Sequence, residues 1–251
     1  MADSDTLCGL RPTGDLHLGH YFAVVKPALA GADVLIADLH APDPDYRTKN
    51  HLITNLQRTL MGFQIEARHI YLQSDMFDSD WFFKLMSLAP LGELKRMTQF
   101  KVSTTPNAHL LTYPVLMTLD VAGYKYVVVG DDQKQHLEFA QTLLRRYNRV
   151  YGANTTIPEA LPTAGRIRSL TKPDRKMSKS EPSGCLFLED PPDVIATKIR
   201  RAVTNEAGLA NLRSLYTLFE CPEPMPETSN LALKSILTGR IISVLKELHG
   251  S

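Results

Sequence analysis

Short apolar runs with β propensity alternate along this chain with longer stretches of helical periodicity. The run Val34-Leu35-Ile36-Ala37 precedes an amphipathic segment that carries Ile53, Leu56 and Leu60 on one face, and His69-Ile70-Tyr71-Leu72 follows that segment. This alternation is typical of strand-helix-strand units, in which helices cover a parallel sheet. We therefore predict an α/β fold built on a parallel sheet.

A second half of the sheet is predicted to begin at Tyr126-Val127-Val128-Val129 and to continue through a turn at Gly130-Asp131-Asp132. The helix that follows has an apolar inner face made of Leu137, Ala140, Leu144 and Tyr147. The two halves together predict one doubly wound sheet. The stretch between them, residues 76–122, reads as a helical insertion. Pro90 closes a first helix capped by Asp78 or Ser79, a second helix covers 91–101, and Pro114 interrupts a later one.

The last part of the chain is predicted to be helical. One helix contains Ile195 and Ile199, a short helix follows around 212–219, and the final helix runs from Asn230 to Leu248. The final helix carries one apolar stripe made of Leu233, Leu237, Ile241, Val244 and Leu248.

Composition favours a soluble intracellular protein of cytoplasmic type. The 251 residues are 43% hydrophobic and 22% charged, which suffices for one sizeable core. The three cysteines form no CxxC pair, and we find neither a basic, apolar leader nor an apolar run of membrane-spanning length. Net charge is −4 over residues 1–140 and +5 over 141–251, so phosphate or RNA is expected to meet the second part through local patches.

Two short peptides carry side chains suited to phosphate. His17-Leu18-Gly19-His20 opens a predicted helix, so its imidazoles and backbone N–H groups would face an anion from the positive helix end. Lys176-Met177-Ser178-Lys179-Ser180 places two ammonium groups and two hydroxyls on a predicted loop. Either peptide alone is weak evidence for phosphate binding, because such a histidine pair can have a structural role and a Lys/Ser run is usually solvated surface. Together they indicate a bound nucleoside triphosphate that is attacked at its α-phosphorus.

These peptides resemble the HIGH and KMSKS motifs of class I aminoacyl-tRNA synthetases. Three further segments resemble the bacterial-type tryptophanyl-tRNA synthetases, namely residues 92–101, 110–117 and 130–136. The match covers residues 7 to about 205 in the family's order.

The resemblance implies a particular division of the chain. A Rossmann-like catalytic domain of the HUP class would span residues 1–189, with a dimerisation insertion at about 76–122 and the KMSKS loop at about 172–182. A reduced helical tRNA-binding region would span 190–251.

The implied reaction is attack of an amino-acid carboxylate on the α-phosphorus of ATP, a step that needs charge stabilisation and alignment. His17 and His20 would meet the phosphates, Lys176 and Lys179 would neutralise the leaving pyrophosphate, and Gly19 would leave room for the nucleotide. Mg²⁺ would accompany ATP, held largely by the phosphates, with no metal site in the protein itself. The family analogy adds Lys101 as a third cation, with a solvated helix residue as the alternative. Further ATP-binding positions are Arg11, Pro12, Thr13, Gly130, Asp131, Asp132, Ile167, Met177, Ser178 and Ser180.

Asp132 follows a predicted strand at the edge where doubly wound sheets bind ligands, so it is placed to accept hydrogen bonds from the ribose. Tyr113 and Gln133 resemble the residues that orient the substrate's α-amino group. Asp120, three residues after Met117, resembles the acceptor of the indole N–H.

The remaining pocket positions come from the same resemblance. His40 matches a position near the amino-acid pocket, with an ordinary loop histidine as the alternative. Leu7 and Cys8 stand where family members commonly have an aromatic residue and Ser, which alters the expected floor of the indole pocket.

The resemblance implies that the chain binds L-tryptophan, ATP and tRNA(Trp). It also implies a homodimer formed through the inserted helices around 94–100, with no membrane contact. The carboxyl-terminal helical region is shorter than in familiar members, because a proline-rich loop leads almost directly to the last helix. We therefore expect reduced anticodon contacts and more reliance on the acceptor stem.

Three other functions remain open. A tyrosyl-tRNA synthetase-like enzyme is the nearest, because a phenol O–H can also satisfy the carboxylate of Asp120. A nucleotidyltransferase with an HxGH motif is a more distant alternative, and it does not explain the presence of the KMSKS peptide. A non-charging, synthetase-derived RNA-binding or regulatory protein would not require the intact His17, His20, Lys176 and Lys179.

Overall fold

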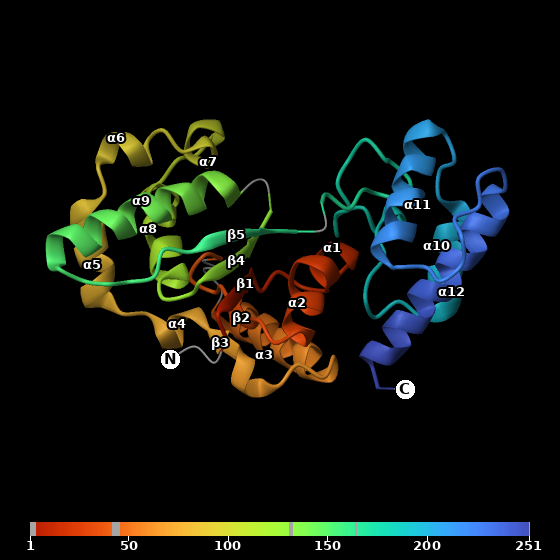
Figure 1. Ribbon diagram of the computed structural model, residues 1–251, viewed down its shortest axis with the longest axis horizontal. Coiled ribbons are helices and arrows are strands. Elements are labelled where there is room, and N and C mark those ends of the chain that lie inside the picture. Colours follow the sequence, from red (N-terminus) through yellow and green to blue (C-terminus); the bar gives the residue numbers. More distant parts are fainter. Residues whose placement is uncertain (1–3, 42–45, 131–132, 164, 251) are drawn as a thin grey trace. The chain divides into compact units, whose positions relative to one another are not determined.

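A computed structural model describes residues 4–41, 46–130, 133–163 and 165–250 of the chain. It contains a five-stranded sheet in the order β3-β2-β1-β4-β5, and every strand pairs in parallel with its neighbours (Figure 1). The strands are β1 (Thr6–Leu10), β2 (Asp33–Ile36), β3 (Ile70–Leu72), β4 (Tyr126–Val129) and β5 (Glu159–Pro162). Strand order reverses between β1 and β4, which confirms the predicted doubly wound parallel sheet.

The predicted strands and the helices beside them form as expected, and two further strands were not predicted. The strand β2 is buried throughout and β4 alternates between half-buried and buried residues, so their apolar residues gave a clear signal. β5 is mostly exposed and contains Pro162, so neither its composition nor its periodicity marks it as a strand. Because β1 pairs with both β2 and β4, Leu7 lies beside Asp33 on one side and Val127 on the other, where the two halves of the sheet meet.

The connections between strands are helical. Between β1 and β2 lie α1 (Leu18–His20), a π-helical turn (Tyr21–Val25) and α2 (Lys26–Leu29). Between β2 and β3 lie α3 (Tyr46–Gly62) and a 3₁₀ turn (Ala67–His69). The insertion comprises α4 (Gln73–Met76), α5 (Ser79–Leu88), α6 (Leu91–Leu94), α7 (Thr98–Val102) and α8 (Ala108–Val121). The later helices are α9 (Lys134–Tyr151), a 3₁₀ turn (Pro182–Gly184), α10 (Pro192–Arg201), α11 (Glu206–Leu218) and α12 (Asn230–Leu248).

The helical insertion is present, with two corrections to its internal boundaries. The single helix expected over 91–101 is broken into α6 and α7. Pro114 does not interrupt its helix, because α8 continues through it and buries every residue from 114 to 119. The expected cap is confirmed, since Asp78 Oδ1 accepts a hydrogen bond from the Trp81 N–H at 2.9 Å.

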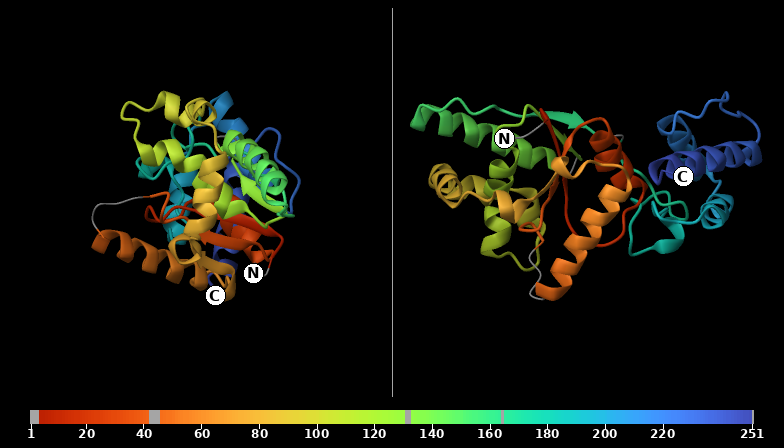
Figure 2. Two further views of the ribbon diagram at one scale, coloured as in Figure 1. Left: turned by 90° about the vertical axis from the view of Figure 1, so that its left-hand side faces the viewer. Right: turned by 90° about the horizontal axis from the view of Figure 1, so that it is seen from below.

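The insertion packs on α9 through its own hydrophobic core. This core joins α5, α8 and α9, which lie together in both further views (Figure 2). Its buried members are Leu85, Leu94, Met97, Val115, Leu119, Phe139, Leu143 and Leu144. Arg146 on α9 forms two hydrogen bonds with the carboxylate of Glu93, at 2.8 and 2.6 Å, and so ties α6 to this core.

The chain divides into two compact units, each made of separated stretches of sequence. The first unit comprises residues 1–13, 27–57 and 66–163 and holds the sheet. The second comprises 14–26, 58–65 and 164–251. This division follows packing, so the predicted functional boundary at residue 189 stays a prediction.

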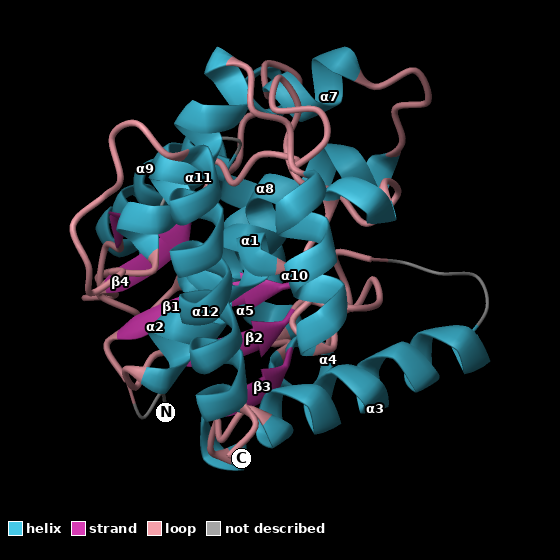
Figure 3. Ribbon diagram, turned by 90° about the vertical axis from the view of Figure 1, so that its right-hand side faces the viewer, coloured by secondary structure: helices cyan, strands magenta, loops and turns pink. Residues whose placement is uncertain are grey.

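The second unit packs α10, α11 and α12 together, as Figure 3 shows. Tyr21 stacks on Phe219 with 5.8 Å between ring centroids, and Phe22 meets the same ring edge-on at 5.0 Å. These contacts fix the π-helical turn to the end of α11. Lys234 on α12 donates hydrogen bonds to the Arg200 and Ala202 carbonyls at 2.9 and 2.7 Å and thereby caps α10.

The last helix has the predicted bounds and a slightly different buried stripe. Leu245 is buried, whereas Val244 is only half-buried, so the stripe follows a four-residue step at this point. Among the helices in the described part of the chain, none is both long and apolar enough to cross a lipid bilayer.

Candidate active site

The His17-Leu18-Gly19-His20 peptide forms a closed network at the start of a continuous helical segment. His17 is the N-cap, and its Nδ1 accepts a hydrogen bond from the Gly19 N–H at 3.0 Å. His20 Nδ1 accepts a hydrogen bond from the His17 N–H at 3.1 Å. Each imidazole therefore does for this helix start what Ser and Glu side chains do in a capping box.

These hydrogen bonds determine the protonation of both rings. Because each Nδ1 accepts from a backbone N–H, the proton of each neutral ring must sit on Nε2. Burial, together with the nearby ammonium groups of Lys179 and Lys176, lowers the pKa of His17 to about 4. Burial, with help from His17 and Lys179, lowers the pKa of His20 to about 3. Both rings are thus neutral Nε2–H donors at pH 7.

The glycine between the histidines has a local structural role that the sequence did not indicate. A Cβ at residue 19 would lie 2.7 Å from Cε1 and 3.0 Å from Nδ1 of His17. Only glycine therefore lets the His17 ring fold back onto the Gly19 N–H.

The KMSKS peptide is held by backbone pairing. Met177 N–H donates to the Ile167 carbonyl and Ser169 N–H donates to the Arg175 carbonyl, at 2.9 and 3.0 Å, so residues 167–177 form a hairpin. Met177 is 2% exposed and anchors this hairpin in the second unit, whereas Lys176 is exposed. The Met177 side chain is therefore buried, while the side chain of Lys176 beside it is exposed.

Lys179 reaches back to the loop that precedes the histidines. Its Nζ donates a hydrogen bond to the Gly14 carbonyl at 2.9 Å. A second attachment lies one residue from His17, where Leu18 N–H donates to the Leu186 carbonyl at 3.0 Å. The structure thus brings the His17–His20 peptide and the KMSKS peptide into one compact unit, although about 160 residues separate them.

The remaining positions predicted to bind ATP are divided between the two units. Ser178 and Ser180 lie in the KMSKS peptide, with 3.0 Å between their hydroxyl oxygens. Arg11, Pro12 and Thr13 follow β1 in the first unit, and Gly130 follows β4, so these four lie at the carboxyl ends of the two strands where the sheet reverses. Asp131 and Asp132 fall outside the described residues. Lys101 is exposed on α7, and its role stays a prediction.

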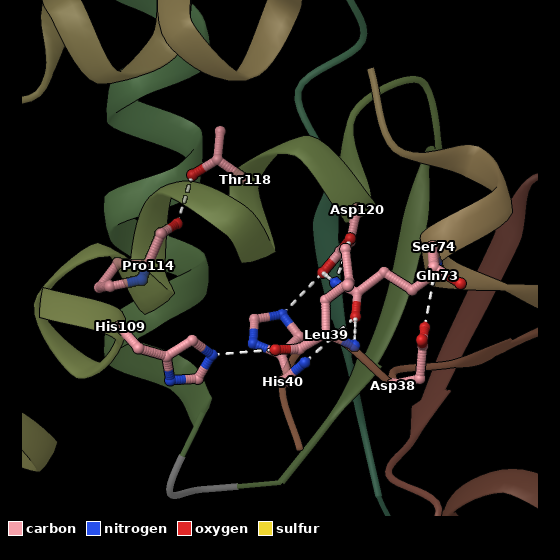
Figure 4. Close-up of polar contacts among 9 residues, drawn as sticks. All are labelled: Asp38, Leu39, His40, Gln73, Ser74, His109, Pro114, Thr118 and Asp120. Atoms are coloured by element: carbon pink, nitrogen blue, oxygen red, sulfur yellow. Dashed lines mark hydrogen bonds and ion pairs between the residues drawn. The ribbon is translucent and has the colours of Figure 1, made fainter. Parts of the chain in front are cut away.

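The predicted indole acceptor lies in a buried polar cluster of the first unit (Figure 4). Asp120 Oδ2 lies 2.8 Å from His40 Nε2, and the two side chains are 9% and 4% exposed. The Gln73 amide nitrogen donates to Asp120 Oδ1 at 2.8 Å and to Oδ2 at 2.9 Å. Because a carboxylate only accepts, His40 must carry its proton on Nε2 here.

Gln73 was not predicted from the sequence, although it is 1% exposed and central to the cluster. It directly follows β3, at the same edge of the sheet where residues 37–40 follow β2. Its Oε1 accepts hydrogen bonds from the Leu39 and His40 N–H groups at 2.9 and 3.3 Å. The one signal in the sequence is that a polar residue directly follows a strand. That this residue lies close to His40 follows only from the pairing of β3 with β2.

Two rings extend the cluster. The Tyr113 ring lies 4.0 Å from the His40 ring, measured between centroids, and His136 stands 5.3 Å beyond Tyr113. His109 Nε2 donates to the Leu39 carbonyl at 2.9 Å, which fixes the loop that carries His40. His40 Nδ1 is buried and has no hydrogen-bond partner among the described residues, so a ligand atom would complete it.

The other predicted pocket residues pack as core or begin a helix. Leu7 and Met117 belong to one buried cluster, which Leu35, Val121, Val127, Val129, Leu137 and Ala140 complete. Gln133 occupies the N-cap position of α9, and its N–H donates to the Gly130 carbonyl at 3.0 Å. Contact of these residues with tryptophan stays a prediction.

Comparison with known proteins places this chain and its fold in a family. Residues 2–240 match the family described as tRNA synthetases class I (W and Y). The tryptophan–tRNA ligase of Clostridium acetobutylicum is 38% identical over 96% of this chain and 76% of its own length. That of Caldanaerobacter subterraneus is 35% identical over 84% of this chain and 74% of its own length. The chain therefore belongs to the class I tRNA synthetases of the tryptophan and tyrosine group.

Solved structures agree with this assignment. The crystal structure of tryptophanyl-tRNA synthetase from Mycoplasma pneumoniae matches with a TM-score of 0.80 and 30% identity, over 97% of this chain and 85% of that one. The tyrosyl-tRNA synthetase of Archaeoglobus fulgidus, complexed with L-tyrosine, matches with a TM-score of 0.78 at 21% identity, over 98% and 89%, which shows a shared fold. The fold alone therefore does not separate tryptophan from tyrosine.

Proposed function

We propose that the chain activates L-tryptophan with ATP to tryptophanyl-adenylate and transfers the tryptophanyl group to tRNA(Trp). The observation that carries this proposal is the gathering of two neutral imidazole donors and two lysine ammonium groups in one unit. Such a set suits the α- and β-phosphates of ATP. The tryptophan–tRNA ligases that this chain resembles support the amino acid.

The proposed chemistry begins with attack of the tryptophan carboxylate oxygen on the α-phosphorus. The bond from the α-phosphorus to the bridging oxygen breaks, and pyrophosphate leaves with the electron pair of that bond. The Nε2–H groups of His17 and His20 donate hydrogen bonds to phosphate oxygens, with no proton transfer, because both rings are already neutral. Lys176 and Lys179 stabilise the charge that grows on the leaving pyrophosphate.

In the second step, a ribose hydroxyl at the 3′ end of the tRNA attacks the adenylate carbonyl and AMP leaves. Asp132 is proposed to hold the ATP ribose, and Tyr113 with Gln133 the substrate's α-amino group. Lys101 is proposed as a further cation for the phosphates. Asp120 would accept the indole N–H, and its burial makes an unmatched ligand costly.

Mg²⁺ is proposed to arrive with ATP rather than to occupy a site of the protein. Among the described residues, no group of three or more His, Cys, Asp and Glu side chains could hold a metal ion. The phosphate oxygens of ATP would supply most of its ligands, with water completing an octahedral shell.

An ATP–pyrophosphate exchange assay with each amino acid tests the proposed activity. We expect exchange with tryptophan, and much weaker exchange with tyrosine and phenylalanine. Exchange driven by tyrosine would assign the chain to the tyrosyl branch of the family. Absence of exchange with any amino acid, from folded protein, would favour a non-charging descendant.

We propose that anticodon contacts are reduced. The connection between α11 and α12 spans residues 219–229 and contains three prolines, so it adds no further helix to the carboxyl-terminal region. Charging assays with anticodon-substituted and acceptor-stem-substituted tRNA(Trp) test this, and the acceptor-stem changes should cost more. A complete loss of charging on anticodon substitution would contradict it.

A homodimer is also proposed, with a modified contact surface. Leu94 and Met97, in the predicted contact segment, are buried in the chain's own core, so they are not available to a partner. Phe77, Phe83 and Leu91 are exposed on the same insertion and offer apolar area instead. Light scattering should report a dimer at micromolar concentration, and Phe83→Asp should convert it to a monomer.

A further inference from the structure

We infer that Gln73 is a positioning residue for tryptophan recognition, which holds the Asp120 carboxylate so that one oxygen faces the indole N–H. This inference rests on the proposed function and adds a residue that the sequence did not single out. It predicts that Gln73 acts on the N–H of the substrate through Asp120, without touching the substrate.

The orientation of the Gln73 amide is determined by its neighbours. On one side lie two backbone N–H groups, of Leu39 and His40, which only donate. On the other side lie the two Asp120 oxygens, which only accept. A flipped amide would place oxygen against oxygen and N–H against N–H, so the flip is excluded by chemistry.

The amide therefore works as a rigid link between backbone and carboxylate. The backbone segment is itself held, because His109 donates to the Leu39 carbonyl and Asp38 Oδ1 accepts from the Ser74 N–H at 3.0 Å. The Gln73 amide nitrogen contacts both Asp120 oxygens and His40 contacts Oδ2 alone, so the two side chains together fix the position and the plane of the carboxylate.

The contacts leave Asp120 with capacity for another donor. A carboxylate has about four lone-pair positions, and the described residues use three of them. Oδ2 receives both His40 and Gln73, while Oδ1 receives Gln73 alone. Oδ1 is therefore the oxygen that can accept the indole N–H.

The cluster also shows a feature expected of a ligand site rather than of ordinary core. His40 is 6% exposed, and its Nδ1 has no hydrogen-bond partner in the described part of the chain. Buried polar atoms in structural clusters are almost always paired. An unpaired nitrogen on the ring that contacts Asp120 is therefore expected where a ligand supplies the missing hydrogen bond.

The first test removes the link and asks whether the loss depends on the indole N–H. Gln73→Met keeps the length of the side chain but donates and accepts nothing. We expect its KM for tryptophan in pyrophosphate exchange to rise about tenfold, with kcat little changed. β-(3-Benzothienyl)alanine replaces the N–H by sulfur, so its KM should hardly change. The preference of the enzyme for tryptophan over this analogue should fall by the same factor of about ten.

The second test keeps the shape and alters the charge. Gln73→Glu still accepts from the backbone, but it can donate to Asp120 only while protonated. The charged and titratable groups that face this position are Asp120, His40, Asp38 with its partner Lys49, and His109. They are present in both proteins, so the difference between the two pH profiles reports on residue 73. We expect the variant's KM for tryptophan to rise with pH relative to wild type.

Gln141→Met is the matched control. The amide nitrogen of Gln141 donates to the Pro158 carbonyl at 2.7 Å, in a half-buried position of the same unit and outside the cluster. This variant should leave the preference for tryptophan over the analogue as in wild type. Thermal unfolding of all variants checks that each one folds.

The outcomes separate this inference from the proposed function. Gln73 would be only structural if Gln73→Met raised the KM for tryptophan and for the analogue by the same factor and Gln73→Glu had the pH profile of wild type. If Gln73→Met does not fold, the pH profile of Gln73→Glu decides alone. If tryptophan does not support ATP–pyrophosphate exchange by the wild-type protein, the proposed function itself is overturned.

Discussion

The two polar clusters of this chain are built in opposite ways. The His17 and His20 network joins residues three apart in sequence and closes within one helical turn. The Asp120 cluster joins side chains that lie 47 and 80 residues apart in sequence, from two strand ends and a helix. The first is therefore set by local backbone hydrogen bonds, whereas the second depends on the order of strands in the sheet.

This difference extends to what each cluster presents. The histidine network uses its backbone-facing nitrogens for folding and leaves two N–H donors, a composition that suits an anion. The Asp120 cluster uses donors to surround a carboxylate and leaves an acceptor, which suits a substrate N–H. A local change should therefore damage the first, and any shift between strands should damage the second.

The largest expected effect is on the phosphate side. Lys179→Ala should lower kcat for pyrophosphate exchange by about 100- to 1000-fold and leave the KM for tryptophan nearly unchanged, because the ammonium group acts on charge that appears in the transition state. Stopped-flow adenylate formation measures this directly. Arg175→Ala, which removes a positive charge from the hairpin that leads into the KMSKS peptide, is the control. If kcat and tryptophan affinity fall together, Lys179 has been assigned wrongly.

The next effect tests the amino-acid side. Asp120→Ala should raise the KM for tryptophan about 10- to 100-fold, because it removes the acceptor and leaves the donors of Gln73 and His40 unpaired. The KM for ATP should stay near the wild-type value. Steady-state exchange at varied tryptophan and varied ATP separates the two. An equal rise in both KM values would mean that the clusters are not independent.

A smaller effect tests how local the histidine network is. Gly19→Ala places a Cβ against the His17 ring and should push the ring off the Gly19 N–H, with about a tenfold loss in kcat/KM for ATP. Gly239→Ala is the matched control in the same unit, because its Cβ would meet nothing within 4 Å. Wild-type activity in Gly19→Ala would show that the ring tolerates another position.

The smallest effect concerns stability against pH. His17 and His20 have pKa values of about 4 and 3 in the folded chain, against 6.5 in the unfolded one. Between these values the unfolded chain binds more protons, so the free energy of unfolding falls as pH drops below 6.5. With allowance for partial exposure, we expect about 1 kcal/mol more loss between pH 7 and 5 in wild type than in His17→Gln/His20→Gln. Urea unfolding at the two pH values measures this, and equal losses would contradict it.

The sequence predicts β2, β3 and β4 because their apolar runs alternate with amphipathic helices, whereas it predicts neither β1 nor β5. It predicts that the peptide with His17 and His20 opens a helix, but not that each ring accepts a hydrogen bond from a backbone N–H there. It does not predict Gln73, whose importance arises only when β3 pairs with β2 beside α8. It also misses the continuity of α8 through Pro114, since burial of the flanking turns outweighs the one hydrogen bond that proline removes.

The second compact unit takes residues 14–26 and 58–65 from early in the chain and joins them to residues after 164. A single cut near residue 163 would consequently yield no autonomous fragment. The helices after the cut would lose the aromatic contacts that Tyr21 and Phe22 make with Phe219. Any chimera that exchanges the helical region with that of a relative must carry the histidine peptide along with it. Recombination in this family is therefore expected to move His17, His20 and the carboxyl-terminal helices as one inherited block.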